Sequence, residues 1–97
     1  MTFLEGIETV MTWGIKDKML SGFGPEIQKA LDRHKSFDWG DLNEDDKQMN
    51  DDAVKYRTEN GKLGDRLFSA YELSFGKIYI ITEYDESVTT LLLPEEY

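Results

Sequence analysis

The stretch of sequence that decides the fold is RLFSAYELSFGKIYIITE, residues 66–83. Its first half is typical of an extended segment whose side chains alternate between two faces with a period of two. The dipeptide Phe75-Gly76 predicts a tight turn, and the segment KIYIITE that follows is rich in the β-branched and aromatic residues that strands favour. We therefore expect a β-hairpin over these residues.

A third strand is expected at VTTLLL, residues 88–93, between a turn at residues 84–87 and Pro94, which cannot donate to a strand ladder. Three strands joined by tight turns predict an antiparallel meander. Its middle strand should be the best buried, because it has apolar residues on both faces. Residues 88–93 would then form an exposed edge, which could pair with a second copy of the chain in a homodimer.

Two helices are expected before the hairpin. Pro25 suits the first turn of a helix over residues 26–34, where apolar residues recur at helical spacing. Asn43 is a good N-cap for a second helix, whose first three residues are acidic and suit the positive end of the helix dipole. Asn60-Gly61 predicts its end. The residues expected to share one face of this second helix are Leu42, Met49, Ala53 and Tyr56.

The N-terminal region supports two interpretations. Residues 7–15 have apolar residues at helical spacing, and residues 9–13 can equally form a short edge strand that ends at Gly14. We favour a strand or extended segment, followed by a helical turn at residues 15–20. The whole chain predicts an α+β protein of one domain, residues 1–97, with a small three- to four-stranded antiparallel sheet and two or three helices packed on one face.

Composition excludes several classes of protein. The chain has no Cys, which excludes disulfide scaffolds, thiolate metal sites and cysteine nucleophiles, and its single His, His34, excludes multi-histidine zinc sites. No run approaches the roughly 20 apolar residues of a membrane span. Residues 1–6 lack the basic and apolar regions of a signal peptide. We expect a soluble, cytoplasmic protein that does not bind a membrane and has no cofactor.

Catalytic and metal-binding patterns are equally weak. His34 lies on the apolar face of the helix 26–34, which favours a packing role. Neither Ser69 nor Ser87 lies in a Gly-x-Ser-x-Gly elbow. Residues 41–52 have the length of a calcium-binding loop but lack its central glycine. The sequence therefore predicts neither an enzyme nor a metal site.

Charge is the most distinctive property of the chain. The formal net charge is -9, and residues 38–60 contain eight acids and three bases, whereas residues 1–37 contain five of each. These acids are either a solvated helix face that keeps the protein in solution or a surface that binds a basic partner. Trp39 is either the edge of the core or an exposed anchor for that partner. The candidate partner-binding residues are Asp38, Trp39, Asp41, Glu44, Asp45, Asp46, Asp51 and Asp52.

A set of motifs follows the chain in a fixed order: DWGDL (38–42), Asp46, NDDA (50–53), RLFSAY (66–71), KIYIITE (77–83), Ser87, Thr89-Thr90 and LLLPEEY (91–97). In these motifs, over roughly residues 25–97, the chain resembles a family of small uncharacterised proteins carried by plasmids, phages and other mobile elements. Some members are labelled plasmid-related proteins or type I restriction subunits. The family tends to have Asp-Arg-Ser where this chain has Asp85-Glu86-Ser87, so a base is lost here. The resemblance implies a mobile-element setting.

Two functions remain open. The first is a non-enzymatic, DNA-mimic-like inhibitor from a mobile element, of the anti-CRISPR or anti-restriction kind. Its acids would bind the basic surface of a host defence complex that targets nucleic acid, without binding nucleic acid itself, since like charges repel. The alternative is a small regulatory or ligand-binding module that acts on a protein partner through its sheet face, with Tyr71 and Tyr79 as the residues to test.

Overall fold

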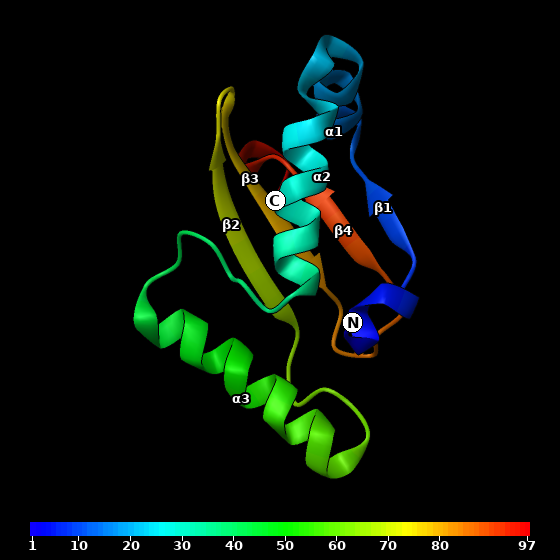
Figure 1. Ribbon diagram of the computed structural model, residues 1–97, viewed down its shortest axis with the longest axis vertical. Coiled ribbons are helices and arrows are strands. Elements are labelled where there is room, and N and C mark those ends of the chain that lie inside the picture. Colours follow the sequence, from blue (N-terminus) through cyan, green and yellow to red (C-terminus); the bar gives the residue numbers. More distant parts are fainter.

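The computed structural model describes residues 1–97 and shows an α+β protein built on one four-stranded sheet, in the order β1-β4-β3-β2 (Figure 1). Short 3-10 turns lie near both termini, at Phe3–Gly6 and Pro94–Glu96, and a π-helical turn at Met19–Phe23 joins the first two helices. In chain order, the strands and α-helices are β1 (Thr9–Met11), α1 (Trp13–Lys18), α2 (Gly24–Lys35), α3 (Glu44–Asn60), β2 (Leu67–Leu73), β3 (Gly76–Thr82) and β4 (Thr89–Leu92).

The hairpin predicted from residues 66–83 is confirmed as β2 and β3. The two strands are antiparallel, and their register pairs Leu67 with Thr82 and Tyr71 with Ile78. Strand β4 then pairs antiparallel with β3, which places β3 between two neighbours. The C-terminal meander is therefore present as expected.

The sheet as a whole is mixed, so the expectation of a purely antiparallel sheet is wrong. Strand β1 pairs parallel with β4, with Thr9 opposite Thr89 and Met11 opposite Leu91. Strand β4 thus has a neighbour on each side, and the exposed edge expected at residues 88–93 does not exist. Parallel pairing was not visible in the sequence because a three-residue strand is too short to show a pattern.

Helices α1 and α2 cover one face of the sheet, and the main core lies beneath them. Pro25 lies in the first turn of α2, as predicted. Helix α2 lies over one face of the sheet (Figure 1), and its residues Ile27, Ala30 and Leu31 belong to the core. The buried residues of this core are Ile15, Ile27, Ala30, Leu31, Tyr71, Ile78, Ile80 and Leu91.

Helix α3 does not share that face. It lies beyond one end of the sheet and beside β2, where a second, smaller core forms (Figure 1). This core joins Ala53 of α3 to Leu67 of β2, together with Leu4, Trp39 and Leu63. The caps of α3 are as predicted: the Asn43 side chain accepts a hydrogen bond from Asp46 N, and Gly61 ends the helix with a φ of 83°. No helix in the structure combines the length and the apolar character needed to cross a membrane.

Candidate functional site

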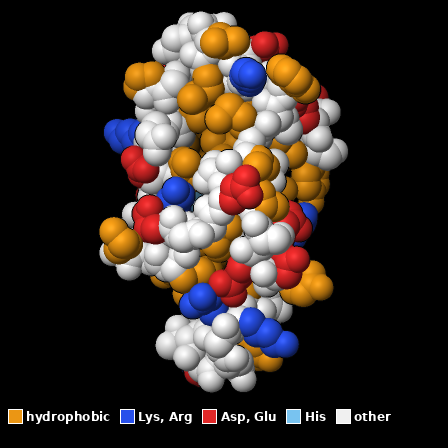
Figure 2. All heavy atoms as spheres, turned by 90° about the vertical axis from the view of Figure 1, so that its right-hand side faces the viewer, with side chains coloured by type: hydrophobic (Ala, Val, Ile, Leu, Met, Phe, Trp, Pro, Cys, Tyr) orange, Lys and Arg blue, Asp and Glu red, His pale blue; other side chains and the backbone are white.

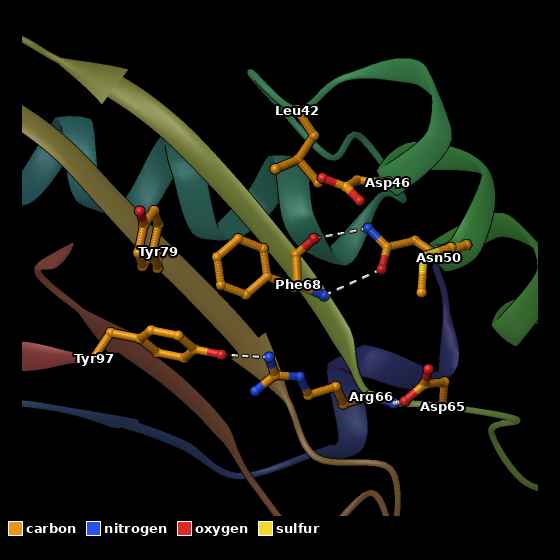
Figure 3. Close-up of a pocket in the computed structure, with 9 residues that line it drawn as sticks. Leu42, Asp46, Asn50, Asp65, Arg66, Phe68, Tyr79 and Tyr97 are labelled. Carbon is orange, nitrogen blue, oxygen red and sulfur yellow. Dashed lines mark hydrogen bonds between the residues drawn. The ribbon is translucent and has the colours of Figure 1, made fainter.

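The face of the sheet opposite α1 and α2 carries an aromatic cluster. Phe68 of β2 and Tyr79 of β3 have ring centroids 4.8 Å apart, and the C-terminal Tyr97 has its ring centroid 5.9 Å from each of them. Phe68 and Tyr79 are half-buried, whereas Tyr97 is 63% exposed. This cluster provides an apolar floor at the surface (Figure 3).

Helix α3 forms the wall beside this floor, in an orientation that the sequence did not predict. The expected apolar face would bury Met49 and Tyr56, but these side chains are 58% and 44% exposed. Asn50 is buried instead, because its amide binds the backbone of Phe68: its Nδ2 donates to the Phe68 carbonyl at 2.7 Å, and its Oδ1 accepts from Phe68 N at 3.2 Å. A polar contact therefore sets the rotation of α3 and leaves Met49 exposed.

Between this wall and the floor lies a groove of about 310 Å³, which we call the α3 groove (Figure 3). Its charged groups are two carboxylates, Asp46 and Asp65, and the guanidinium of Arg66. The guanidinium carbon of Arg66 lies 5.8 Å from the Phe68 ring centroid and 5.5 Å from that of Tyr97, and Arg66 also donates a hydrogen bond to the Tyr97 hydroxyl. The residues that line the groove are Leu42, Asp46, Met49, Asn50, Asp65, Arg66, Phe68, Tyr79 and Tyr97.

A second hollow of about 280 Å³ continues the groove along α3. It shares Met49 and Asp65 with the first and adds Asp52, Tyr56 and Gly64, with Ala53 at its base. Exposed apolar side chains of α3 are thus flanked by carboxylates along more than one helical turn. Asp46, Asp52 and Tyr79 are candidates from the sequence, but no pattern in the sequence indicates that the α3 acids lie beside the sheet aromatics.

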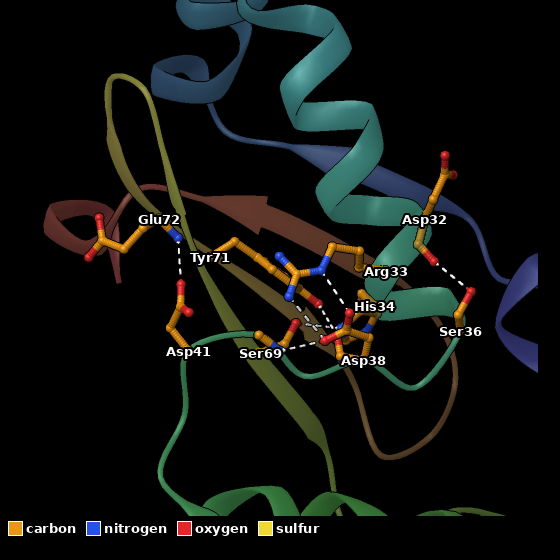
Figure 4. Close-up of polar contacts among 10 residues, drawn as sticks. Asp32, Arg33, His34, Ser36, Asp38, Asp41, Ser69, Tyr71 and Glu72 are labelled. Atoms are coloured by element: carbon orange, nitrogen blue, oxygen red, sulfur yellow. Dashed lines mark hydrogen bonds and ion pairs between the residues drawn. The ribbon is translucent and has the colours of Figure 1, made fainter.

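The acids of the segment before α3 bind the protein's own donors. Asp38 accepts two hydrogen bonds from the Arg33 guanidinium, at 2.8 and 3.2 Å, and this contact lowers the pKa of its carboxyl group (Figure 4). Asp41 accepts from the backbone N of Glu72 in β2 at 2.8 Å (Figure 4). Both carboxylates remain exposed, but each is oriented by the fold.

Trp39 is not an exposed anchor, so this part of the predicted partner surface is wrong. Its side chain is 3% exposed and belongs to the second core, where its ring lies 5.7 Å from that of Phe37. Its indole Nε1 donates to Asp51 of α3 at 2.8 Å, which gives Asp51 a structural role as well. Of the two interpretations of Trp39, the one that assigns it to a core is therefore correct.

The remaining predicted acids lie on α3. Glu44 is 3.7 Å from Lys47, and Asp52 accepts a hydrogen bond from Gln48 at 2.8 Å. Asp45 and Asp46 form no ion pair. The acidic segment is therefore divided: Asp38, Asp41 and Asp51 hold the fold, and the other acids of α3 are available, with Asp46 and Asp52 beside the groove.

His34 has the structural role that its place in the sequence predicted. It is completely buried, with Nδ1 2.6 Å from Ser69 Oγ and Nε2 2.9 Å from Thr82 Oγ1. Burial lowers its pKa to about 3, so the ring is neutral near pH 7, and it is inaccessible to a substrate. No group of three or more His, Asp or Glu side chains is arranged to hold a metal ion.

The groove residues come from the segment before α3, α3 itself, the loop after it, both strands of the hairpin and the C-terminus, so no local motif in the sequence marks them. Their chemistry suits binding, because an apolar floor with a carboxylate rim complements a basic and partly apolar surface. Comparison with family models, with curated proteins and with solved structures finds no match to this chain.

Proposed function

We propose that this protein is a cytoplasmic, non-enzymatic binding protein that takes a basic segment of a nucleic-acid-binding protein partner into the α3 groove. The single observation that supports this best is the composition of the groove: exposed Met49 and Tyr97 on an aromatic floor, with Asp46, Asp52 and Asp65 around them. Apolar and aromatic contacts provide affinity at the centre of an interface, and charges at its rim provide specificity and rate of association.

The protein's own Arg66 supports the idea that the groove accepts an arginine of a partner. The protein's own Arg66 lies over the rings of Phe68 and Tyr97, the geometry of a cation–π contact. A partner arginine next to it would find Asp46 and Asp65 as carboxylate acceptors, which the planar guanidinium binds in a bidentate manner. Arginine is also the basic residue most enriched at interfaces.

The charge of the whole chain favours the same class of partner. A net charge of -9 accelerates encounter with a basic protein surface and opposes contact with DNA or RNA. Proteins that bind nucleic acid carry such basic surfaces. Blocking one of them would prevent the nucleic acid from entering, as a DNA mimic does.

The resemblance to proteins of plasmids and phages suggests the biological role. Such elements benefit from inhibiting host complexes that destroy foreign nucleic acid. We therefore propose a restriction or CRISPR complex as the target. A regulatory partner bound mainly by the aromatic floor is the second candidate, supported by the central place of Phe68 and Tyr79 in the groove.

The test is protection of incoming DNA in a host with an active restriction or CRISPR system. We expect the wild-type protein to protect, and Asp46→Lys and Met49→Ala each to reduce protection roughly tenfold or more, the size of effect expected for interface anchors. Matched controls are Asp17→Lys and Tyr84→Ala, which change an exposed acid and an exposed aromatic residue that do not line the groove.

Loss of protection in the groove variants but not in the controls supports the proposal. Equal protection by all variants, with the wild type active, would exclude the groove. If only the aromatic-floor variant Tyr79→Ala loses activity and acid reversal is tolerated, the second candidate is correct.

A further inference from the structure

The two outer edges of the sheet differ in whether their backbone hydrogen-bonding groups are occupied. Along the outer edge of β2, backbone groups that would be free are bound by other parts of the chain. The backbone of Phe68 is bound by the Asn50 amide, and that of Ala70 by the backbone at Trp39 and Asp41. The backbone N–H groups of Glu72 and Ser74 donate to the carboxylates of Asp41 and Glu26. This edge is closed to any additional strand.

The outer edge of β1 has no such cover. Thr89 N donates to the Glu8 carbonyl at 2.8 Å and Thr12 N donates to the Leu91 carbonyl at 3.1 Å, so the backbone of Glu8 and Thr12 faces β4. Because strand hydrogen bonding alternates with a period of two, the backbone N–H and C=O of Thr9 and Met11 face away from the sheet. These four groups are a template for another strand.

Exposed apolar side chains surround this open edge. Val10 and Met11 of β1 are 39% and 41% exposed, and Trp13 and Leu20 just beyond it are 77% and 78% exposed. Figure 2, which looks onto the side where β1 lies, shows hydrophobic side chains gathered in the upper part of this face. A hollow lined by Met11, Thr12, Trp13, Lys16, Met19 and Leu20 adjoins the strand.

The charge of this region identifies a second copy of the chain as a suitable occupant. Two molecules of charge -9 repel each other over most of their surface, but residues 1–37 have as many bases as acids. The segment that carries the open edge therefore adds no net charge of its own to the repulsion between two copies. An open edge is also self-complementary under two-fold symmetry, as an isologous interface requires.

We propose that the protein forms a homodimer in which β1 pairs antiparallel with β1 of a second copy. The outward groups of Thr9 and Met11 set the register: Thr9 of one copy exchanges two hydrogen bonds with Met11 of the other, and the reverse pair exchanges two more. Val10 then lies at the two-fold axis opposite Val10 of the second copy. The two sheets become one continuous sheet of eight strands.

This arrangement leaves the α3 groove free, because β2 and β3 lie at the far side of each sheet from β1. The two-fold axis is perpendicular to the continuous sheet, so both grooves open on the same face of it. A dimer of this kind is a bivalent binder. The inference rests on the edge of β1 alone and stands or falls independently of what the groove binds.

Sedimentation equilibrium tests the dimer. We expect the wild-type protein to sediment as a dimer at micromolar concentration and Val10→Lys to sediment as a monomer, because two lysines would lie directly opposite across the axis. Met49→Lys is the matched control, since it adds the same charge at an exposed apolar residue of α3 and should remain a dimer. Circular dichroism verifies that Val10→Lys is folded.

Hydrogen exchange gives an answer that needs no variant. We expect the amides of Thr9 and Met11 to be protected at high concentration and to lose that protection on dilution. A wild-type protein that stays monomeric, or a Val10→Lys variant that remains a dimer, would overturn the proposal. So would protection that appears only when a different protein is added, which would assign the edge to a strand of that protein.

Discussion

His34 shows what a single residue contributes to this fold. It joins α2 to the sheet through Ser69 of β2 and Thr82 of β3, and Thr82 in turn lies 2.8 Å from the Thr89 hydroxyl of β4. A buried chain of hydrogen bonds thus connects one helix with three strands, and no buried side-chain polar atom in the structure lacks a partner. The sequence predicted a packing histidine. It could not predict the hydrogen-bond partners of the ring, because these depend on strand register.

The stability of the protein should fall as the pH is lowered through the weakly acidic range. The native state resists protonation of His34 because burial lowers its pKa to about 3, whereas the unfolded chain takes up the proton near pH 6.5. The free energy of unfolding is therefore not reduced by His34 well above pH 6.5. Below that pH it falls by about 1.4 kcal/mol per pH unit. Between pH 6.5 and 5 the loss should reach about 2 kcal/mol, before most carboxyl groups titrate.

Urea denaturation of the wild type and of His34→Gln over this range provides the measurement. The variant should be less stable at pH 7, because it loses part of the hydrogen-bond chain. Its stability should nevertheless be nearly independent of pH from 6.5 to 5. A wild type as insensitive to pH as the variant would contradict the assignment of a neutral, buried ring.

At the scale of elements, the segment between α2 and α3 is attached to the outer edge of β2 by a single β-bridge. Gly40 pairs with Ala70 as an isolated parallel bridge, and Asp41 N donates to the Ala70 carbonyl at 2.7 Å. Gly40 has a φ of 76°, and a Cβ there would lie 2.0 Å from the Ala70 carbonyl oxygen. Only glycine fits this close approach.

Gly40→Ala should therefore cost far more stability than Gly61→Ala. Gly61 also has a left-handed φ, of 83°, but a Cβ there meets nothing within 4 Å. We expect about 1 kcal/mol for Gly61→Ala from backbone strain alone, and roughly 3 kcal/mol or more for Gly40→Ala, where strain and a backbone clash combine. Thermal or urea denaturation of the two variants measures the difference, and similar losses would refute the close packing of the segment against β2.

The helix α3 illustrates how far the sequence predicts an element. Both of its ends were predictable, because caps are local: Asn43 and Gly61 lie where the pattern placed them. Its buried side was not, because the contact that orients it is the Asn50 amide on the Phe68 backbone, a polar pairing that an apolar stripe cannot indicate. The same rotation exposes Met49 and creates the wall of the groove.

For the whole molecule, composition and local patterns predicted the α+β class and the meander, and they failed where distant segments meet. The parallel pairing of β1 with β4 joins residues 9–11 to residues 89–91. The α3 groove joins Leu42 and the α3 acids to Tyr97 at the C-terminus. Such contacts depend on the arrangement of complete elements, so no short motif marks them.

Folding also distributes the acidic residues unevenly over the molecule. Acids that the sequence presents as one run are divided between those that hold the segment before α3 and those that line the groove. The N-terminal third stays balanced. The two proposed contacts, with a second copy and with a basic partner, would therefore use different surfaces.

The most direct test of the central claim is quantitative capture of partners from host lysate at low and high salt, about 0.05 M and 0.5 M. The double variant Asp46→Lys with Met49→Ala is compared with the wild type and with the control Asp17→Lys with Tyr84→Ala. We predict that the wild type and the control capture the same nucleic-acid-binding protein at low salt. Binding should weaken roughly tenfold at high salt and be lost in the groove variant. Capture of that protein by the groove variant at the wild-type level, or capture that does not depend on salt, would contradict the account.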